Sequence, residues 1–593
     1  MNVTRTFDLL DLYRSQYQKP DVFNIKREGK WNAYSSEDYI SFATNFSCGL
    51  LAMGFNPGDK IITITNNRPE WNFVDIGMAM VGIIHVPVFT SLGTNELSFI
   101  ITHSEAKAVI VSDNKFYSIL IQVINGLDAP IPLFCFDRVP PARNWMEIVE
   151  LGKHSSEKYL AEVEIIKSKI SPEDWATLIY TSGTTGMAKG VMLSHKNLVE
   201  NFKAASVVFG MGPDDKYLSI LPLCHVGGRM GNYQTQYSGS SIYYAESMGT
   251  IASDMREIHA DGFDAVPRIL EKIFDNVIAK GNKLTGIKKK LFFWAVKLGL
   301  DYKLPGDSSW LYRKKHALAD KLIFSKWREA LGGNIKLAGC GGASLQPRLE
   351  RVFWAAGIKI INMYGLTETS PIITINRQTK PSVKLGSVGT VIPGVEVKIA
   401  GDGEILARGH DIMIGYYKNE ELTAEVVDQE GWFHTGDIGT LDSQGFLFIT
   451  DRKKDVFKLS NGKFISPQIM EGRLKESAFI EHSIIVGEQE KFVSALIVPD
   501  FLWLRNWCQK NGHVFKNQED MIALPAVKKA IADEIGKLNR LLNPHEKINR
   551  FKLISEEWSP ETGELSPTLK LKRGFILEKY KAVLEQIYPK TGI

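Results

Sequence analysis

Apolar positions along the first 115 residues alternate between a helical and a strand-like spacing. One predicted helix carries apolar residues every three or four positions, at Tyr39, Phe42, Phe46, Leu50 and Met53. Ser35 and Asp38 stand before it with the spacing of a capping box. Three apolar runs predict strands, namely GDKIITIT, VGIIHVPVF and AKAVIVSD. Helix and strand patterns that alternate in this way are typical of parallel α/β layers.

The pattern changes twice along the rest of the chain. A second α/β stretch runs from about Trp175 to Lys380, and it includes AVPRILEKIF with Pro267 early in a predicted helix. Beyond Lys380, short β runs separated by glycine turns predict a small barrel. The charged run DRKKD follows the apolar strand FLFIT and indicates a hinge at Asp451. We therefore predict two domains, residues 1–450 and 451–593.

A basic segment from Lys280 to Arg328 stands apart from this organisation. Its apolar residues form a stripe at helical spacing, with lysines on another face: Leu284, Ile287, Leu291, Trp294 and Leu298 against Lys283, Lys290 and Lys297. A basic amphipathic helix can lie on an anionic membrane surface. The alternative is a solvated helix whose apolar stripe packs on the protein core.

Bulk properties exclude several classes of protein. The chain has 71 basic and 67 acidic residues, a near balance that gives no nucleic-acid signature. Its five cysteines are scattered and lack C-x-x-C spacing, so neither a disulfide framework nor a zinc site is expected. The N-terminal segment carries acidic residues where a secretory signal needs an apolar core. No run of about 18 apolar residues occurs, so we expect a cytoplasmic protein without a spanning helix.

The most informative motif is YTSGTTGMAKG, from Tyr180 to Gly190, directly after the apolar run Trp175–Tyr180. Glycines allow backbone N–H groups to approach an anion closely, and the hydroxyl groups and the lysine add donors and a positive charge. The predicted polyphosphate loop contains Thr181, Ser182, Gly183, Thr184, Thr185, Gly186 and Lys189. Its spacing differs from that of a Walker loop. The alternative is a flexible surface loop.

The segment YGLTET, Tyr364 to Thr369, combines an aromatic ring, hydroxyl groups and one carboxylate. Tyr364 can stack on a purine, and Thr367 can bind an α-phosphate. Glu368 can hold Mg²⁺, a hard cation that prefers oxygen ligands. The alternative is a turn after the strand IKIINM with a helix-capping threonine.

Two further segments carry a carboxylate and basic residues. WFHTGD ends at Asp437, whose carboxylate can accept hydrogen bonds from a ribose diol, and Arg452 can reach the same ribose. The dipeptide Asn461–Gly462 is a hairpin-turn signal. In SPTLKLKR, Lys570 on a mobile domain can bridge a substrate carboxylate and an α-phosphate. A solvated basic patch is the alternative.

Together these segments resemble the adenylate-forming superfamily and, within it, the long-chain fatty acyl-CoA synthetases. The resemblance covers nearly the whole chain. It includes five further stretches, NRPEW, LPLCHVGGR, SIYYAES, AVPRILEKIF and CGGASL. It implies a large N-terminal α/β domain with two sheet layers and a small β-barrel, followed by a smaller, mobile α+β C-terminal domain.

The resemblance also implies roles for individual residues. Lys570 is the adenylation lysine, Thr184 and Glu368 hold the metal, and Asp437 and Arg452 bind the ribose. Gly341, Gly342 and Ala343, together with Asn362 and Tyr364, line the adenine and acyl pockets, and His225 lies at the acyl substrate. Lys454 and Lys458 lie near the nucleotide, and Asn461 and Gly462 near the pantetheine arm of CoA.

The expected reaction has two steps and uses ATP, Mg²⁺ and coenzyme A. A long-chain fatty carboxylate becomes an acyl-adenylate with release of pyrophosphate, and CoA then displaces AMP. Two alternatives differ in class. One is a ligase that passes its adenylate to a carrier protein, and the other is a nucleotide-binding or fatty-acid-sensing protein without catalysis. We expect a cytoplasmic protein that binds no nucleic acid and makes peripheral contact with the inner membrane face.

Overall fold

The computed structural model describes residues 2–127, 129–181, 188–566 and 569–589. The chain forms two compact units. The first comprises Met1–Val397, Ala407–His434 and Ser443–Leu447, and the second comprises Lys398–Leu406, Thr435–Asp442 and Phe448–Ile593. The predicted boundary at residues 450 and 451 stays a prediction.

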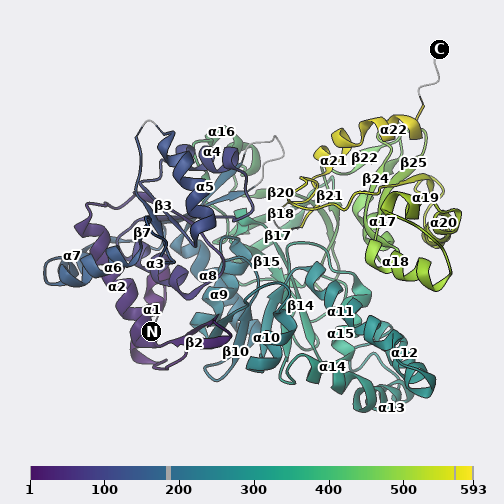
Figure 1. The fold of residues 1–593 in the computed structure, drawn as a ribbon, viewed down its shortest axis with the longest axis horizontal. Coiled ribbons are helices and arrows are strands. Elements are labelled where there is room, and N and C mark those ends of the chain that lie inside the picture. The colour runs from purple at the N-terminus through teal and green to yellow at the C-terminus, as the bar shows by residue number, and fades with distance from the viewer. Residues whose placement is uncertain (1, 128, 182–187, 567–568, 590–593) are drawn as a thin grey trace. The chain divides into compact units, whose positions relative to one another are not determined.

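A nine-stranded sheet in the order β16-β15-β14-β13-β12-β10-β11-β1-β2 forms one layer of the first unit (Figure 1). The six central strands, β14-β13-β12-β10-β11-β1, pair in parallel, and the antiparallel strands β15, β16 and β2 complete the two edges. The strands are β1 (Phe23–Arg27), β2 (Lys30–Tyr34), β10 (Lys216–Ser219), β11 (Ser241–Tyr244), β12 (Gly262–Ala265), β13 (Leu337–Cys340), β14 (Lys359–Gly365), β15 (Ile372–Ile375) and β16 (Thr390–Val391).

An eight-stranded sheet in the order β19-β9-β8-β4-β3-β5-β6-β7 forms the second layer. The three strands predicted from apolar runs are β3, β4 and β5, which pair in parallel and confirm that prediction. The strands are β3 (Lys60–Ile64), β4 (Ile84–Val88), β5 (Ala108–Val111), β6 (Leu133–Cys135), β7 (Arg143–Asn144), β8 (Trp175–Thr181), β9 (Lys189–Ser194) and β19 (Gly415–Tyr416).

Two helix starts of the first unit follow signals in the sequence. Ser35 caps the predicted helix, accepting a hydrogen bond from the Asp38 amide, and the capping box is confirmed. Pro267 occupies the first turn of its helix, as predicted. The helices are α1 (Leu9–Ser15), α2 (Ser36–Ala52), α3 (Pro69–Met80), α4 (Thr94–Ser104), α5 (Asn114–Asn125), α6 (Met146–His154), α7 (Ser156–Lys169), α8 (His195–Phe209), α9 (Val226–Tyr237), α10 (Ile251–Ile258), α11 (Pro267–Asn282), α12 (Gly286–Leu300), α13 (Trp310–Ala319), α14 (Ser325–Ala330), α15 (Pro347–Ala355) and α16 (Glu420–Val426).

The basic segment from Lys280 to Arg328 forms several short helices. Leu284 precedes α12, so the predicted apolar stripe is interrupted at its first residue. Leu284, Trp294 and Leu298 pack against the hydrophobic core under α10 to α15. The stripe of α12 is therefore largely covered by protein, which favours the packed-helix alternative for this element. Ile287 is the exception, with 76% of its surface exposed.

A smaller sheet occupies the region predicted as a barrel. Its strands follow the order β17-β18-β20-β21, with β17 and β21 at its edges. They are β17 (Val395–Ile399), β18 (Glu404–Gly409), β20 (Phe433–Leu441) and β21 (Leu447–Arg452). The boundary between the two compact units runs through these strands.

The C-terminal part of the second unit is an α+β structure with its own hydrophobic core. A hairpin joins β22 (Phe457–Lys458) to β23 (Phe464–Ile465), and β24 (Ile480–Val486), β25 (Val493–Pro499) and β26 (Ile548–Leu553) form a second sheet. Its helices are α17 (Pro467–Leu474), α18 (Phe501–Lys510), α19 (Gln518–Ala523), α20 (Pro525–Asn539), α21 (Arg573–Lys579) and α22 (Lys581–Ile587). The predicted fold class is confirmed.

All five cysteines are buried and unpaired. The expectation that no disulfide framework exists is consistent with this arrangement. Within the described residues, no helix combines the length and the apolar character needed to cross a membrane.

Candidate active site

The two ends of the predicted phosphate loop meet across an antiparallel strand pair. β8 ends at Thr181 and β9 begins at Lys189, and these two residues are register partners. Both strands are largely buried in the second sheet layer. The structure therefore fixes the entry and exit of the loop. Its other predicted members, Ser182, Gly183, Thr184, Thr185 and Gly186, lie outside the described residues.

Glu368 and Lys189 lie near the same tyrosine, Tyr416 of β19. The Tyr416 hydroxyl donates a hydrogen bond to Oε1 of Glu368 at 2.8 Å. Nζ of Lys189 is 5.3 Å from the centroid of the Tyr416 ring. Burial and the neighbouring Glu368 carboxylate both raise the pKa of Tyr416, so the hydroxyl stays a donor at neutral pH. The fold thus brings the predicted metal ligand and the lysine of the phosphate loop together.

Sequence reasoning missed Tyr416. The feature that brings Tyr416 to the site is the antiparallel pairing of β19 with β9, in which Tyr416 is the register partner of Val191. The Met413 amide also donates to the Glu368 carbonyl at 2.9 Å, which holds the segment before β19 against η3 (Thr367–Thr369).

Gly341, Gly342 and Ala343 follow β13, and Asn362 and Tyr364 belong to β14, with Asn362 at its middle. The two strands are parallel neighbours in which Cys340 is the register partner of Asn362. Carboxyl ends of adjacent parallel strands meet at one edge of a sheet, where open α/β sheets bind ligands. Gly342 has a φ of +80°, a conformation that favours glycine. Thr367 opens η3 just beyond Tyr364.

Glu350 of α15 is a buried carboxyl that was not predicted. Its Oε2 accepts a hydrogen bond from the Gly386 amide at 2.6 Å, and its Oε1 has no hydrogen-bond partner among the described residues. Burial raises the pKa of Glu350 to about 8, so the carboxyl is largely neutral at pH 7.

His225 caps the N-terminus of α9, with its Nδ1 accepting a hydrogen bond from the Gly227 amide at 3.0 Å. One turn along, the fully buried Arg229 binds the Asp75 carboxylate. Arg229 also donates to Oγ1 of Thr177 in β8. These contacts fix the helix that carries His225 to the strand that leads into the phosphate loop. Arg229 and Asp75 were not predicted.

Asp437 and Arg452 lie together in the second unit. Nε of Arg452 is 3.0 Å from Oδ1 of Asp437, whose side chain is only 6% exposed. The Asp437 amide donates to Oγ1 of Thr435 at 3.1 Å. Asp437 belongs to β20, and Arg452 is the last residue of β21. The predicted ribose pair is therefore close in space, 15 residues apart in the chain.

The predicted CoA and nucleotide residues follow β21. Lys454 lies in the turn after β21, and Lys458 belongs to β22, with its Nζ 5.2 Å from the Phe464 ring centroid. Asn461 and Gly462 lie in the turn of the β22–β23 hairpin, which confirms the turn prediction. Asp451, at the predicted hinge, is buried, and burial raises its pKa to about 6.

Lys570 belongs to the second unit, whereas Glu368 belongs to the first. The Lys570 amide donates to Oγ of Ser566 at 3.0 Å, and its carbonyl accepts from the Ser566 amide at 2.7 Å. A bridge between Leu565 and Leu571 encloses this segment. The backbone of Lys570 is thus fixed within its own unit.

Comparison with known families matches both parts of the chain. Residues 12–417 match the AMP-binding enzyme family, and residues 454–592 match the AMP-binding enzyme C-terminal domain. The chain belongs to the AMP-binding enzyme family.

Similar proteins with curated names cover almost the full length. The long-chain-fatty-acid–CoA ligase FadD15 of Mycobacterium tuberculosis is 29% identical over 98% of this chain and 96% of its own. Long chain acyl-CoA synthetase 7, peroxisomal, of Arabidopsis thaliana is 30% identical over 95% of this chain and 83% of its own.

Solved structures share the fold. The anthranilate CoA ligase AuaEII in complex with anthranoyl-AMP has a TM-score of 0.72 at 17% identity, covering 98% of both chains. ATP-bound MatB from Rhodopseudomonas palustris has a TM-score of 0.69 at 20% identity, covering 98% of this chain and all of that chain.

Proposed function

We propose that this protein is an AMP-forming long-chain fatty acid–CoA ligase. Family membership and the names of the full-length relatives support this proposal. The observation that carries most weight is the approach of Glu368 and Lys189 to Tyr416, beside the strands that hold the phosphate loop. That arrangement supports a site for MgATP, because one carboxylate and one cation lie near the same ring.

The donor set around Glu368 suits Mg²⁺ with ATP. Oε1 of Glu368 is held by Tyr416, and its other oxygen makes no hydrogen bond with any described residue. Mg²⁺ usually takes one or two protein carboxylates and completes its shell with substrate phosphates and water. The described residues contain no cluster of three or more acidic, His or Cys side chains suited to a metal ion. When bound, Mg²⁺ would neutralise phosphate charge beside Glu368, with Thr184 as a second ligand.

In the first half-reaction, a carboxylate oxygen of the fatty acid attacks the α-phosphorus of ATP. The new P–O bond forms as the bond to pyrophosphate breaks. Lys570 stabilises the charge between carboxylate and α-phosphate, while Asp437 and Arg452 hold the ribose. Positioning and fixed charges supply most of the catalysis in such displacements.

In the second half-reaction, the second domain turns about Asp451 and Lys570 leaves the site. The CoA thiol attacks the acyl carbonyl, the thiol proton is lost to solvent, and the acyl–oxygen bond to AMP breaks. Asn461 and Gly462 would line the path of the pantetheine arm, with Lys454 and Lys458 near the nucleotide. No enzyme nucleophile is needed, which agrees with five buried cysteines.

The acyl chain would lie along two segments, one that begins at His225 and one that follows the carboxyl end of β13. Buried hydrocarbon adds about 0.8 kcal/mol of binding per CH₂ group. Catalytic efficiency should therefore rise with chain length until the pocket is filled.

A carboxylic-acid panel with ATP, Mg²⁺ and CoA tests this function directly. We expect AMP, pyrophosphate and an acyl thioester, with the highest efficiency for long-chain acids. ADP and phosphate as products would reject the mechanism, and a preference for acetate or aromatic acids would reject the substrate class. Acceptance of carrier-bound pantetheine in place of CoA would favour the carrier-protein ligase. Binding of ATP and fatty acid without pyrophosphate release would favour the sensor.

We also propose a cytoplasmic location and contact with an anionic membrane, through α13 rather than α12. The outer residues Trp310, Leu311 and Leu318 of α13 are 62%, 55% and 50% exposed. Arg313, Lys314 and Lys315 are exposed on the same helix. Its inner side is anchored to the protein: Tyr312 donates to the Leu298 carbonyl, and Nε2 of His316 lies 2.8 Å from the Ala355 carbonyl oxygen. Exposed apolar and basic side chains together suit a lipid interface.

A further inference from the structure

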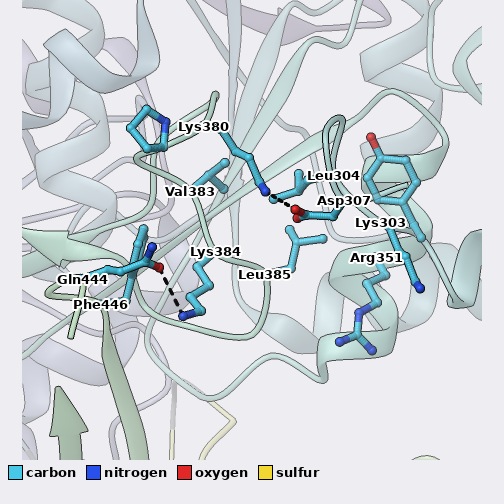
Figure 2. Close-up of a pocket in the computed structure, with 12 residues that line it drawn as sticks. Lys303, Leu304, Asp307, Arg351, Lys380, Val383, Lys384, Leu385, Gln444 and Phe446 are labelled. Carbon is cyan, nitrogen blue, oxygen red and sulfur yellow. Dashed lines mark hydrogen bonds and ion pairs between the residues drawn. The ribbon is translucent and has the colours of Figure 1, made fainter. Parts of the chain in front are cut away.

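The first unit contains a cavity of about 470 Å³ (Figure 2). Three segments build most of it: the stretch that leads into α13, one residue of α15, and the loop between β15 and β16. None of the residues predicted to bind ATP, metal, acyl chain or CoA lines it. Its volume lies within the range of small-molecule sites, roughly 300–1,000 Å³.

Basic residues outnumber acidic residues in the lining. Lys303, Arg351, Lys380 and Lys384 face one acidic residue, Asp307, so four positive charges and one negative charge leave a net +3. Asp307 forms an ion pair with Lys380. Figure 2 shows Lys384 directed toward Gln444, whose Oε1 is 3.5 Å from the lysine Nζ.

Two of the cations form no close ion pair. Lys303 and Arg351 are paired with no carboxylate that the structure describes, although Arg351 partly offsets the raised pKa of the neighbouring Glu350 carboxyl. They lie together on the side of the cavity opposite Lys384 (Figure 2). Arg351 and Lys384 are only partly exposed, so water screens their charges less than on an open surface. Like charges gathered in this way repel one another unless an anion lies between them.

The cavity has a buried apolar part, which we call its floor. Leu304, Val383 and Phe446 form it, and each is less than 7% exposed. Nζ of Lys384 is 5.7 Å from the Phe446 ring centroid. A ligand that satisfies both surfaces carries an anionic group for the rim and an apolar or planar body for the floor. Arginine and lysine beside each other are typical partners of phosphate.

The loop that carries two of the cations is held by hydrogen bonds. Nδ2 of Asn376 donates to the Lys384 carbonyl at 3.2 Å and to the Ser387 carbonyl at 2.9 Å. Oγ of Ser387 donates to the Lys384 carbonyl at 2.8 Å. The Gly386 amide is bound by Glu350, next to Arg351. The backbone that carries Lys384 is therefore held in place before any ligand arrives, which lowers the entropy cost of binding.

We propose that this cavity is a second ligand site that binds a phosphorylated organic anion, separate from the proposed ATP and CoA sites. Phosphate oxygens would lie between Lys303 and Arg351 on one side and Lys384 on the other. The apolar or planar part of the ligand would lie on Leu304, Val383 and Phe446. Both a nucleotide and the head of a phospholipid carry this chemistry.

Calorimetry on the full-length protein tests the proposal. AMP is present at saturation to fill the proposed nucleotide site. The probes are adenosine 3′,5′-bisphosphate, dihexanoyl phosphatidic acid and inorganic phosphate. We expect one organic probe to bind with a stoichiometry of one, and inorganic phosphate to bind more weakly because it leaves the floor uncovered. The organic probe that binds better identifies the source of the ligand.

The Lys303→Ser/Arg351→Ser variant should lose at least tenfold in affinity for that probe. Lys288→Ser/Lys290→Ser on α12 is the matched control, because it removes the same charge outside the cavity lining. Equal losses in both variants, or no organic probe bound by the wild-type protein, would overturn the proposal. Thioester formation should persist in both variants, so this result does not depend on the test of the ligase function.

Discussion

The Tyr416 hydroxyl lies 2.8 Å from Oε1 of Glu368, although 48 residues separate the two in the chain. Tyr416 thereby fixes the orientation of the single carboxylate proposed to hold Mg²⁺. Lys189 lies beside the same ring, so one tyrosine joins the predicted metal ligand to the phosphate loop.

Tyr416→Phe should reduce the rate of pyrophosphate release roughly 10- to 100-fold. A hydrogen bond to a charged group contributes about 1.5–3 kcal/mol, and each 1.4 kcal/mol is a factor of ten. Tyr417→Phe is the control, because its hydroxyl binds the exposed Glu105 instead. Glu368→Gln should be more damaging than Tyr416→Phe. If Tyr416→Phe releases pyrophosphate at the wild-type rate, the tyrosine does not position Glu368.

Lys570→Ala should separate the two half-reactions. An ammonium group between carboxylate and α-phosphate stabilises charge only while the adenylate forms. The variant should lose adenylation by several orders of magnitude, yet convert supplied acyl-AMP and CoA to thioester at a near-normal rate. Lys572→Ala should affect adenylation much less. A larger loss in Lys572→Ala would shift the catalytic assignment by two positions, and equal loss of both half-reactions would contradict the domain rotation.

Trp310→Ser/Leu311→Ser should abolish sedimentation with anionic vesicles. Wild-type binding should weaken with salt, because each basic residue near an anionic surface contributes about 1 kcal/mol. Ile287→Ser on α12 is the control, because it removes a similarly exposed apolar side chain. This variant should bind the anionic vesicles as the wild-type protein does. If replacing Lys288, Lys289 and Lys290 with Glu proves more damaging than the α13 change, α12 is the membrane surface after all.

Asp264→Asn should change how stability depends on pH. Asp264 is buried in β12, where Tyr217 donates to its Oδ2 at 2.8 Å, and burial raises its pKa from 3.8 to about 6. The folded state then holds this proton more tightly than the unfolded chain, so stability falls as pH rises from about 4 to 6. At about 1.4 kcal/mol per pH unit, the Asp264 contribution is about 3 kcal/mol.

Unfolding by urea at a series of pH values measures this effect. The free energy of unfolding of the Asn variant, relative to wild type, should increase between about pH 4 and pH 7. Asp215→Asn is a suitable control, because Asp215 is paired with Lys336 near the surface. If the difference in the free energy of unfolding between variant and wild type stays constant across this pH range, Asp264 does not titrate there.

Local sequence determined many of the strands and helix starts, because these depend on patterns among residues that are close in the chain. Apolar runs predicted β3, β4 and β5, and Ser35 with Asp38 predicted the start of α2. The motifs also placed candidate residues at the ends of strands. Thr181 and Lys189 flank the loop across paired strands, and Asn362 lies beside Cys340. The catalytic roles assigned from the motifs stay predictions.

Only the tertiary structure decided which surfaces are covered. Helical spacing identified an apolar stripe on α12, but spacing does not reveal what that stripe contacts. Trp294 and Leu298 pack on the core, whereas Trp310 and Leu311 of α13 stay exposed. Burial depends on neighbours from distant parts of the chain, which periodicity does not encode.

The sequence by itself therefore determined the class of fold, the family and the residues that carry the proposed chemistry. Tertiary structure alone brought Tyr416 to Glu368 and Glu350 to Gly386, and it gathered Lys303, Arg351 and Lys384 around one cavity. The reason is physical. Strands, caps and turns are set by residues within a few positions of one another, whereas hydrogen bonds, buried carboxyls and clustered charges depend on groups that meet only when the sheets and helices pack.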